Sequence, residues 1–265
     1  MHRITSRTLL TVPLLLASGI ASAADEVASD YWVRIMPVAW FATLDGENQY
    51  AVNGSGDNLK MDDVDLANSE LVFGLEASAK LPILVCLHAG MFAFGTDGSF
   101  TTTGVDFGGQ TMSGQVDATT DLMDIYLEAD LRPLDLDLVG LSIGVAYHFM
   151  QTEVSLNDGT NSAALDEDVQ FPVIALRGHA NLPMLTSLGA EAKIHWMDIS
   201  YQDNHVRYLD ATLQITWRPW EYLGFIGGYR HVMIDIGLDD PPGVNASADL
   251  DITLSGPFLG LIGKF

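Results

Sequence analysis

The sequence predicts an all-β protein: a closed antiparallel transmembrane β-barrel of about ten strands. Three observations lead to this fold class. Apolar and polar residues alternate with a period of two, the connections between the alternating stretches are long and short in turn, and the last stretch ends on Phe265. Successive side chains of a strand point to opposite faces, so a period of two is the signature of a strand with two different faces.

The first residues have the features of a secretory signal peptide. A basic start with Arg3 and Arg7 precedes the apolar stretch from Leu9 to Leu16, and Ala21-Ser22-Ala23 is a small-residue cleavage site. The apolar stretch is shorter than the roughly 20 residues that a membrane-spanning helix needs. We therefore expect residues 1–23 to be removed on export and residues 24–265 to form a single barrel domain.

Ten stretches alternate. They are residues 31–41, 69–79, 83–94, 120–131, 138–150, 170–182, 188–197, 208–218, 222–234 and 250–265. The clearest is 138–150, where one face holds Val139, Leu141, Ile143, Val145, Tyr147 and Phe149. Most of the stretches reach the roughly 9–11 residues with which a tilted strand crosses a membrane. Eight or twelve strands also fit, because 31–41 and 222–234 alternate poorly.

The connections divide into two classes. Four are short and contain proline, which suits a turn: Lys80-Leu81-Pro82, Arg132-Pro133-Leu134, Leu182-Pro183-Met184 and Arg218-Pro219-Trp220. Five are longer and rich in Gly, Asn, Asp and Ser: 42–68, 95–119, 151–169, 198–207 and 235–249. A soluble sandwich has no reason for such regularity, whereas outer-membrane barrels combine short periplasmic turns with long external loops.

Two details refine this prediction. Aromatic residues gather near strand ends, as interfacial girdles do: Trp40, Phe41, Trp196, Trp217, Trp220 and Tyr222. In the last stretch, Leu250, Ile252 and Leu254 have one parity and Leu259, Leu261 and Phe265 the other. A bulge at Ser255-Gly256-Pro257 would restore a single outward face.

The chain is strongly acidic. The chain has 12 Lys and Arg against 35 Asp and Glu, a net charge of −23, so it has no electrostatic footprint for nucleic acid. Cys86 stands alone, which excludes a disulfide framework. Most of the acids fall in the long connections. Asp62, Asp63 and Asp65 are weak candidates for binding Ca²⁺ or Mg²⁺, and a solvated surface is the alternative.

Strand parity places a nearly balanced set of charges in the lumen. The lumen-lining candidates are Arg34, Glu70, Glu76, Asp124, Glu128, Asp130, Arg177, Glu191, Lys193, Asp210, Arg218 and Arg230, and His88, His148, His179, His195 and Lys264 share their parity. They would form either a polar channel lining or a salt-bridged plug. Around Pro183, Arg177 falls roughly opposite Glu191, which suits a cross-strand pair.

The C-terminus carries a resemblance. A final Phe on an alternating strand, here Phe265, resembles the signal that the barrel-assembly machinery reads. With the acidic loops, the Leu-Pro turns and the closing stretch Leu254–Leu261, the chain resembles a family of small uncharacterised proteobacterial outer-membrane β-barrel proteins. The resemblance implies fold and location and transfers no functional site.

A second, more local resemblance concerns catalysis. Asp203-Asn204-His205 resembles the Asp-x-His pair of the ten-stranded omptin proteases. Those enzymes pair it with an Asp-x-Asp in the loop after the third strand, where this chain has only the isolated Asp97, Asp106 and Asp117. An omptin-like protease is therefore a remote alternative, and we expect no enzyme.

The sequence thus predicts a monomeric barrel without a cofactor in a bacterial outer membrane. Two function classes stay open. One is a narrow passive channel for small solutes, or a structural barrel. The other is a surface interaction protein whose acidic loops bind divalent cations, lipopolysaccharide or an external partner. An open lumen would favour transport, and a plugged lumen would favour a structural or binding role.

Overall fold

The computed structural model describes residues 32–52, 56–66, 69–81, 84–136, 138–181, 187–201, 204–239 and 246–265. The predicted signal peptide lies outside the described residues, as does the turn Leu182-Pro183-Met184. Within them, no helix is long and apolar enough to span a bilayer.

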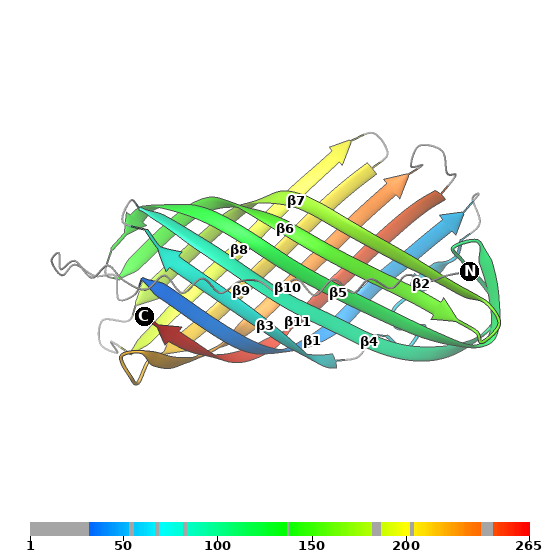
Figure 1. Ribbon diagram of the computed structural model, residues 1–265, viewed down its shortest axis with the longest axis horizontal. Helices are drawn as coiled ribbons and strands as arrows, with labels where there is room; N and C mark the ends of the chain where they lie inside the picture. The colour runs from blue at the N-terminus through cyan, green and yellow to red at the C-terminus, as the bar shows by residue number, and fades with distance from the viewer. Residues whose placement is uncertain are drawn as a thin grey trace, which may run out of the picture.

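The strands form one antiparallel sheet that closes on itself (Figure 1). In chain order they are β1 (Val33–Val52), β2 (Asn58–Lys60), β3 (Ser69–Lys80), β4 (Val85–Phe107), β5 (Gln110–Asp135), β6 (Val139–Asn157), β7 (Ser162–Asn181), β8 (Leu188–Tyr201), β9 (Asn204–Trp217), β10 (Leu223–Asp239) and β11 (Ala246–Lys264). Each long strand pairs with its sequence neighbours, and β11 pairs with β1 from Arg34↔Lys264 to Val52↔Ala246. The predicted barrel of ten strands is confirmed, and the short β2 is an eleventh strand that extends the edge of β1.

The two ends of the barrel differ. The end where β1 begins and β11 finishes carries the short turns, and we call it the terminal end. The opposite end carries the hairpins β4–β5, β6–β7, β8–β9 and β10–β11, and we call it the hairpin end.

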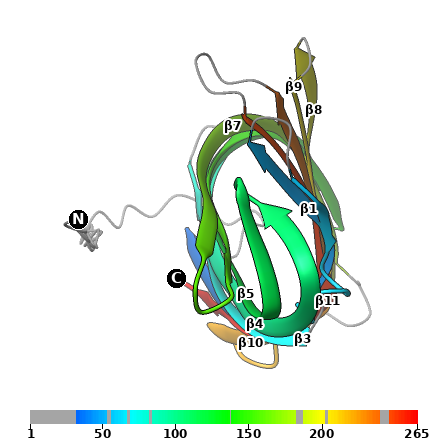
Figure 2. The same cartoon turned by 90° about the vertical axis from the view of Figure 1, so that its right-hand side faces the viewer.

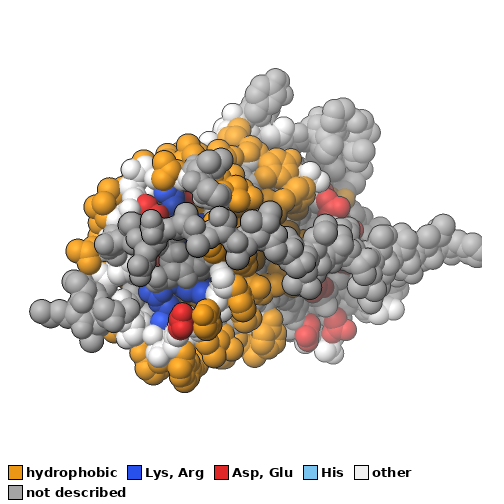
Figure 3. Space-filling view, turned by 60° about the vertical axis from the view of Figure 1, so that its left-hand side comes forward, with side chains coloured by type: hydrophobic (Ala, Val, Ile, Leu, Met, Phe, Trp, Pro, Cys, Tyr) orange, Lys and Arg blue, Asp and Glu red, His pale blue; other side chains and the backbone are white. Residues whose placement is uncertain are grey.

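An apolar band covers the outer surface nearer the terminal end. Along β6 the outward side chains run from Val139 to Phe149 and are largely exposed, and then become polar at Gln151 and Glu153. On β1 the same change occurs between Phe41 and Asp45. Figure 3 shows apolar side chains over much of this face of the wall, with Lys and Arg gathered toward the terminal end and Asp and Glu both beside them and toward the hairpin end. Exposed apolar surface of this extent is the lipid-facing band of a transmembrane barrel.

The strands extend beyond this band. Most residues of the expected long loops 42–68, 95–119 and 151–169 are strand, and the β4–β5 hairpin turns only at Gly108-Gly109. Both glycines have positive φ, +58° and +73°, as a two-residue hairpin turn with the right twist requires. The interpretation of 95–119 as a loop was therefore wrong.

Three further sequence expectations are corrected. Pro133 lies inside β5, next to a register shift between Leu131 and Leu134, and β5 continues to Asp135 before β6 begins at Val139. Proline has no backbone N–H to donate to the neighbouring strand, and the shift of register accommodates it. No bulge occurs in β11, whose register with β1 and β10 is continuous through Ser255–Pro257. Trp40 points inward and is buried, so it belongs to no interfacial girdle.

Candidate functional site

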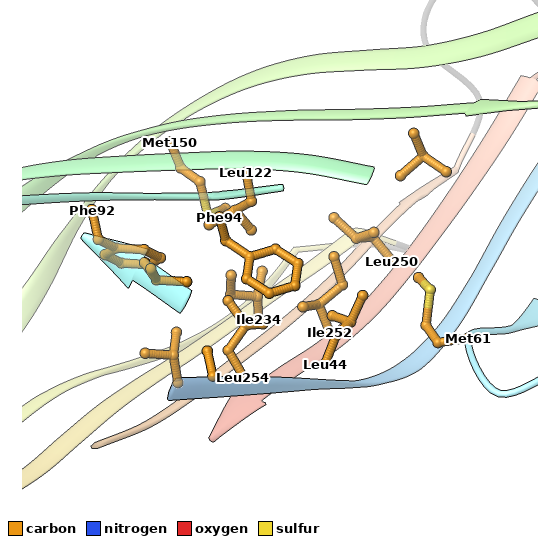
Figure 4. Packing of buried hydrophobic residues seen from close by; sticks show 14 of the residues in the cluster. Leu44, Met61, Phe92, Phe94, Leu122, Met150, Ile234, Leu250, Ile252 and Leu254 are labelled. Atoms are coloured by element: carbon orange, nitrogen blue, oxygen red, sulfur yellow. The ribbon is translucent and has the colours of Figure 1, made fainter. Parts of the chain in front are cut away.

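The barrel interior is filled by two layers of side chains. The half nearer the hairpin end is apolar, which is why β11 has no bulge: Leu250, Ile252 and Leu254 point inward and are buried. Figure 4 shows them facing side chains from the opposite wall. We call this the apolar layer, and it comprises Leu44, Phe92, Phe94, Leu122, Met150, Val154, Val232, Ile234, Leu250, Ile252 and Leu254. Parity alone does not reveal it, because an apolar strand face can meet either lipid or an apolar interior.

The β4–β5 hairpin closes the mouth over the apolar layer. Figure 2 looks onto the hairpin end and shows this hairpin bent inward across the opening. Its tip is fixed on β1, since Gly108 N donates to Tyr50 O over 3.1 Å and the rings of Phe107 and Tyr50 meet edge to face at 5.6 Å. Phe107 and Met112 are fully buried. Met61, Val64 and Leu66, from the turn after β2, belong to the same buried cluster.

A layer of ion pairs, which we call the charged layer, lies between the apolar layer and the terminal end. It contains Glu76, Glu128, Arg177, Lys193, Asp210 and Arg230. Arg230 donates to both carboxylate oxygens of Asp210 over 3.0 and 2.9 Å. Lys193 Nζ lies 3.2 Å from Asp210 and 3.0 Å from Glu76, which stands on the opposite wall. Arg230 also stacks over the ring of Phe92 at 4.5 Å, so this one residue joins the charged layer to the apolar layer.

A second set of ion pairs continues toward the terminal end. Arg177 Nε and Nη2 donate to the two carboxylate oxygens of Glu128 over 2.8 and 2.6 Å. Arg177 Nη1 lies 3.5 Å from the carboxylate of Glu191. Arg34 on β1 reaches Glu191 on β8 over 2.7 Å. The expected contact between Arg177 and Glu191 is present, but their register differs from the expectation: Lys193 lies opposite Arg177, and His179 lies opposite Glu191.

Two histidines link two of the carboxylates through the centre of the lumen. Asp124 contacts His148 Nδ1 at 2.9 Å, His148 Nε2 lies 3.1 Å from His195 Nδ1, and His195 Nε2 lies 3.0 Å from Glu128. These contacts join β5, β6 and β8 across the lumen.

The side chains at the centre of the charged layer are shielded from water. The side chains of His148, His195, Glu128 and Asp210 are all 0% exposed. A water-filled pore would wet the side chains that line it. Buried charges persist only when they are paired, and here each has a hydrogen-bonded partner from another strand. Among the described residues, a salt-bridged plug thus fills the middle of the lumen, and the apolar layer fills the half nearer the hairpin end.

The terminal end opens into a cavity of about 230 Å³. Its lining includes Arg34, Lys80, Arg132, Arg177, Arg218 and Lys264, with Asp135 and Glu191 as the carboxylates and His88 and His179 as the imidazoles. Leu134, Leu136, Leu141 and Ile262 contribute an apolar side. The charged layer forms the floor of this cavity.

Three-residue groups with the chemistry of metal ligands occur twice among the described residues. Cys86, His88 and Asp130 converge beside the cavity, and His205, Asp235 and Asp249 converge at the hairpin end. In the first group Arg132 Nη2 lies only 2.9 Å from the Cys86 sulfur, which opposes a cation. Asp62, Asp63 and Asp65 form no such group; their side chains are exposed along the turn Met61–Asp65.

The remaining sequence candidates lie on the inner face. Asp124, Glu128, Asp130, Arg177, Lys193, Asp210 and Arg230 are buried, as are Arg34 and Lys264. Glu70 shares the inward parity of Val72 and Glu76 and is half-buried near the hairpin end. Arg218 lines the terminal cavity. Cys86 is fully buried on the inner side of β4.

The protease-like motif has a different arrangement from the expected one. Asp203 lies outside the described residues. His205 Nε2 contacts Asp235 Oδ1 at 2.7 Å on the neighbouring strand β10, and Arg207 Nη1 donates to the other oxygen of that carboxylate over 3.3 Å. Asp97, Asp106 and Asp117 are spread along β4 and β5 and form no Asp-x-Asp.

The pKa values of two carboxyl groups at the hairpin end are shifted by the groups around them. Asp251 lies directly opposite both Glu47 and Asp235 in the sheet. Partial burial, and then the charges of Asp235 and Glu47, raise the pKa of Asp251. In the β6–β7 turn, backbone N–H groups of Asn161, Thr160 and Ser113 donate to Asp158 and lower its pKa.

The comparison with solved structures finds outer-membrane barrels. The outer-membrane protease OmpT of Escherichia coli matches with a TM-score of 0.53 at 11% identity, over 91% of this chain and 99% of that one. Neisserial surface protein A matches over 91% of this chain and 100% of its own, at 10% identity and a TM-score of 0.36. OprG of Pseudomonas aeruginosa matches over 89% and 98%, at 13% identity and a TM-score of 0.38.

Sequence comparisons add nothing to these likenesses. No family model matches the chain, and no curated protein matches it. At such low identity, the likeness to OmpT shows a fold and no activity. The fold is that of bacterial outer-membrane β-barrels.

Proposed function

We propose that this protein is an integral outer-membrane barrel with a closed lumen, and that it has a structural, non-catalytic role and forms no diffusion channel. The short turns of such barrels face the periplasm, which puts the terminal end there and the hairpin end outside the cell. The apolar band supports membrane insertion. One observation carries the proposal: the ion pairs that cross the lumen are excluded from water, with 0% exposure at His148, His195 and Asp210.

Conductance tests this closed state. The chain without residues 1–23 is refolded, checked by its heat-dependent mobility on a gel, and added to a planar bilayer; a general-diffusion porin refolded in the same way is the positive control. We expect conductance steps from the porin and none from this protein. Reproducible steps from the folded protein would contradict the closed lumen and restore the passive channel.

A second candidate function is supported by the carboxylates at the hairpin end. Glu47, Asp251 and Asp235 stand side by side across β1, β11 and β10. Like charges directly opposite each other destabilise a sheet. A divalent cation, whether free or bridging to lipopolysaccharide phosphates, would remove that repulsion. We propose this carboxylate row as the cation-binding site, in preference to Asp62, Asp63 and Asp65.

Calorimetric titration with Ca²⁺ in about 0.15 M salt compares the two places. Glu47→Gln with Asp251→Asn should abolish a saturable heat, and Asp62→Asn with Asp63→Asn, which removes the same charge, should retain it. A wild-type protein without saturable heat would leave the acidic residues as a solvated surface. Loss of heat only in the Asp62/Asp63 variant would place the site in the turn.

A further inference from the structure

Three side chains with the chemistry of metal ligands meet on the outer face of the barrel at the hairpin end. His205 comes from β9, Asp235 from β10 and Asp249 from β11, and their ligand atoms all lie within 4.8 Å of one another. Ile234 and Ile236, on either side of Asp235, are buried in the interior, so Asp235 points outward. An imidazole with two carboxylates suits zinc and related transition metals, whereas Ca²⁺ and Mg²⁺ take oxygen ligands.

A glycine in the middle strand brings these side chains together. β10 lies between β9 and β11, and His205 and Asp249 both lie directly opposite Gly237 of β10. The imidazole lies over this glycine, because a Cβ added at Gly237 would overlap Cε1 and Nδ1 of His205. The ring thereby reaches Asp235, two residues earlier on the same face, with 2.7 Å between His205 Nε2 and Asp235 Oδ1.

The ligands are partly shielded and already oriented. The side chains of His205 and Asp235 are only 32% and 20% exposed. Arg207 Nη1 donates to Asp235 Oδ2 over 3.3 Å, and Arg207 Nε lies 3.6 Å from Asp198. Arg207 therefore holds one oxygen of Asp235 and leaves the other facing His205. Metal ligands are commonly oriented by such hydrogen bonds from a second ring of side chains.

The arrangement fits an ion that takes few ligands at short distances. Zinc is bound by about four ligands at about 2.0–2.2 Å, and three from the protein leave one position for solvent. Asp249 is exposed, so rotation of its side chain closes the remaining gap to an ion held by His205 and Asp235. Asp235 also lies directly opposite Asp251, and a cation relieves this repulsion between like charges.

We propose that His205, Asp235 and Asp249 bind a transition-metal ion of the zinc class on the outer surface of the barrel. This site shares Asp235 with the carboxylate row, but it does not rest on Ca²⁺ binding there, because an imidazole is its distinguishing ligand. Affinity for such ions depends on ligand type as well as charge, and imidazole favours Zn²⁺ over Ca²⁺.

Titration calorimetry with Zn²⁺ on the folded, tag-free chain without residues 1–23 tests this proposal, in detergent and about 0.15 M salt. We expect saturable binding in the wild type. His205→Gln should weaken it at least about tenfold, since even the loss of a group that orients a ligand has that effect. His179→Gln is the matched control, because His179 is 34% exposed and lies 3.9 Å from Asp135 at the terminal end. It should bind Zn²⁺ like the wild type.

Gly237→Ala tests the geometry without removing a ligand. The added Cβ would displace the imidazole of His205, so Zn²⁺ binding should weaken. Gly227→Ala on the same strand is the control, because its Cβ would meet first the end of the Leu259 side chain, at 3.1 Å, and it should bind normally. If Gly237→Ala fails the gel-shift test for folding, the exposed Asp249→Asn replaces it.

The two metal sites are separated by variants of the other ligands. Glu47→Gln with Asp251→Asn should abolish the heat of Ca²⁺ and retain saturable Zn²⁺ binding, and His205→Gln should do the reverse. A missing Ca²⁺ heat in the wild type would remove the carboxylate row and leave the zinc site standing. The zinc proposal is overturned by a wild type without saturable Zn²⁺ heat, by equal losses in His205→Gln and His179→Gln, or by unchanged binding in folded Gly237→Ala. Zn²⁺ binding that is lost in the Glu47/Asp251 variant and kept in His205→Gln would also overturn it.

Discussion

At the scale of single residues, the histidine chain shows how much the closed lumen depends on hydrogen bonds. His195 contacts both His148 and Glu128, and all three are buried. His195→Leu would leave two buried polar groups without this partner, at a cost of about 1–3 kcal/mol for each. We expect the free energy of unfolding, measured by urea titration in lipid vesicles, to fall by that amount.

The matched control is His231→Leu. His231 lies on β10 with outward parity, and it is directly opposite Ser255 and Ala211. Its replacement by an apolar residue should leave stability unchanged or slightly increased. Equal losses in the two variants would show that the chain from Asp124 to Glu128 contributes nothing specific.

Asp158 gives a residue-scale prediction that depends on pH. Three backbone N–H groups donate to its carboxylate, and its pKa is lowered from the usual 3.8. A lowered folded-state pKa contributes stability that is present above the unfolded pKa and lost as pH falls through the folded value. The β6–β7 turn should therefore hold its structure at pH 5 and loosen progressively below about pH 4.

Limited digestion with pepsin between pH 5 and pH 2 measures this loosening. Asp158→Asn cannot ionise, so its cleavage at the turn should show a weaker dependence on pH than that of the wild type. Glu153→Gln, at an exposed outward position on the same hairpin, is the control and should behave like the wild type. Wild-type cleavage independent of pH would refute the role of Asp158.

At the scale of elements, the β4–β5 hairpin closes the mouth at the hairpin end through its tip. Phe107 is fully buried against Tyr50. Phe107→Ala should cost about 3–5 kcal/mol if the hairpin stays docked, so we expect the tip to undock instead. Protease added from outside should then cut near Gly108-Gly109 in the variant and leave the wild type intact.

Thr101→Ala, at an exposed position on β4, should not change the digestion. An intact Phe107→Ala hairpin would show that the tip is held without this ring.

Strand number, pairing and inward charges followed from the sequence because each rests on local periodicity. Residues 138–150 alternate without interruption, and parity alone puts His148 inside. The strand extensions were missed because their residues are polar on the outward face, although Gly108-Gly109 is itself a hairpin signal. The error at Leu250, Ile252 and Leu254 has another cause: parity separates two faces but does not say which face meets lipid. The contacts between opposite walls, such as Lys193 with Glu76, depend on the curvature of the closed sheet and leave no local signal.

At the scale of the whole molecule, charge is separated along the barrel axis. Cations line the terminal cavity, paired charges fill the middle, and carboxylates such as Glu47, Asp235 and Asp251 occupy the hairpin end. The middle group consists of ion pairs that are buried, whereas Glu47 at the hairpin end is exposed. The three groups should therefore respond differently to salt, since exposed charges are screened and buried pairs are screened much less.

Amide hydrogen exchange at about 0.05 M and about 0.5 M sodium chloride tests this, because the Debye length falls roughly threefold between these two concentrations. Salt should increase the protection of the hairpin-end segments 44–52 and 246–252, where carboxylates repel one another, and should leave 124–130 and 191–195 unchanged. Potassium chloride should act like sodium chloride if screening is the cause. Glu47→Gln with Asp251→Asn should raise protection at low salt and abolish most of the salt effect there. If salt instead lowers protection in 124–130 and 191–195, water and ions reach the ion pairs of the lumen, and the plug is open on the timescale of exchange.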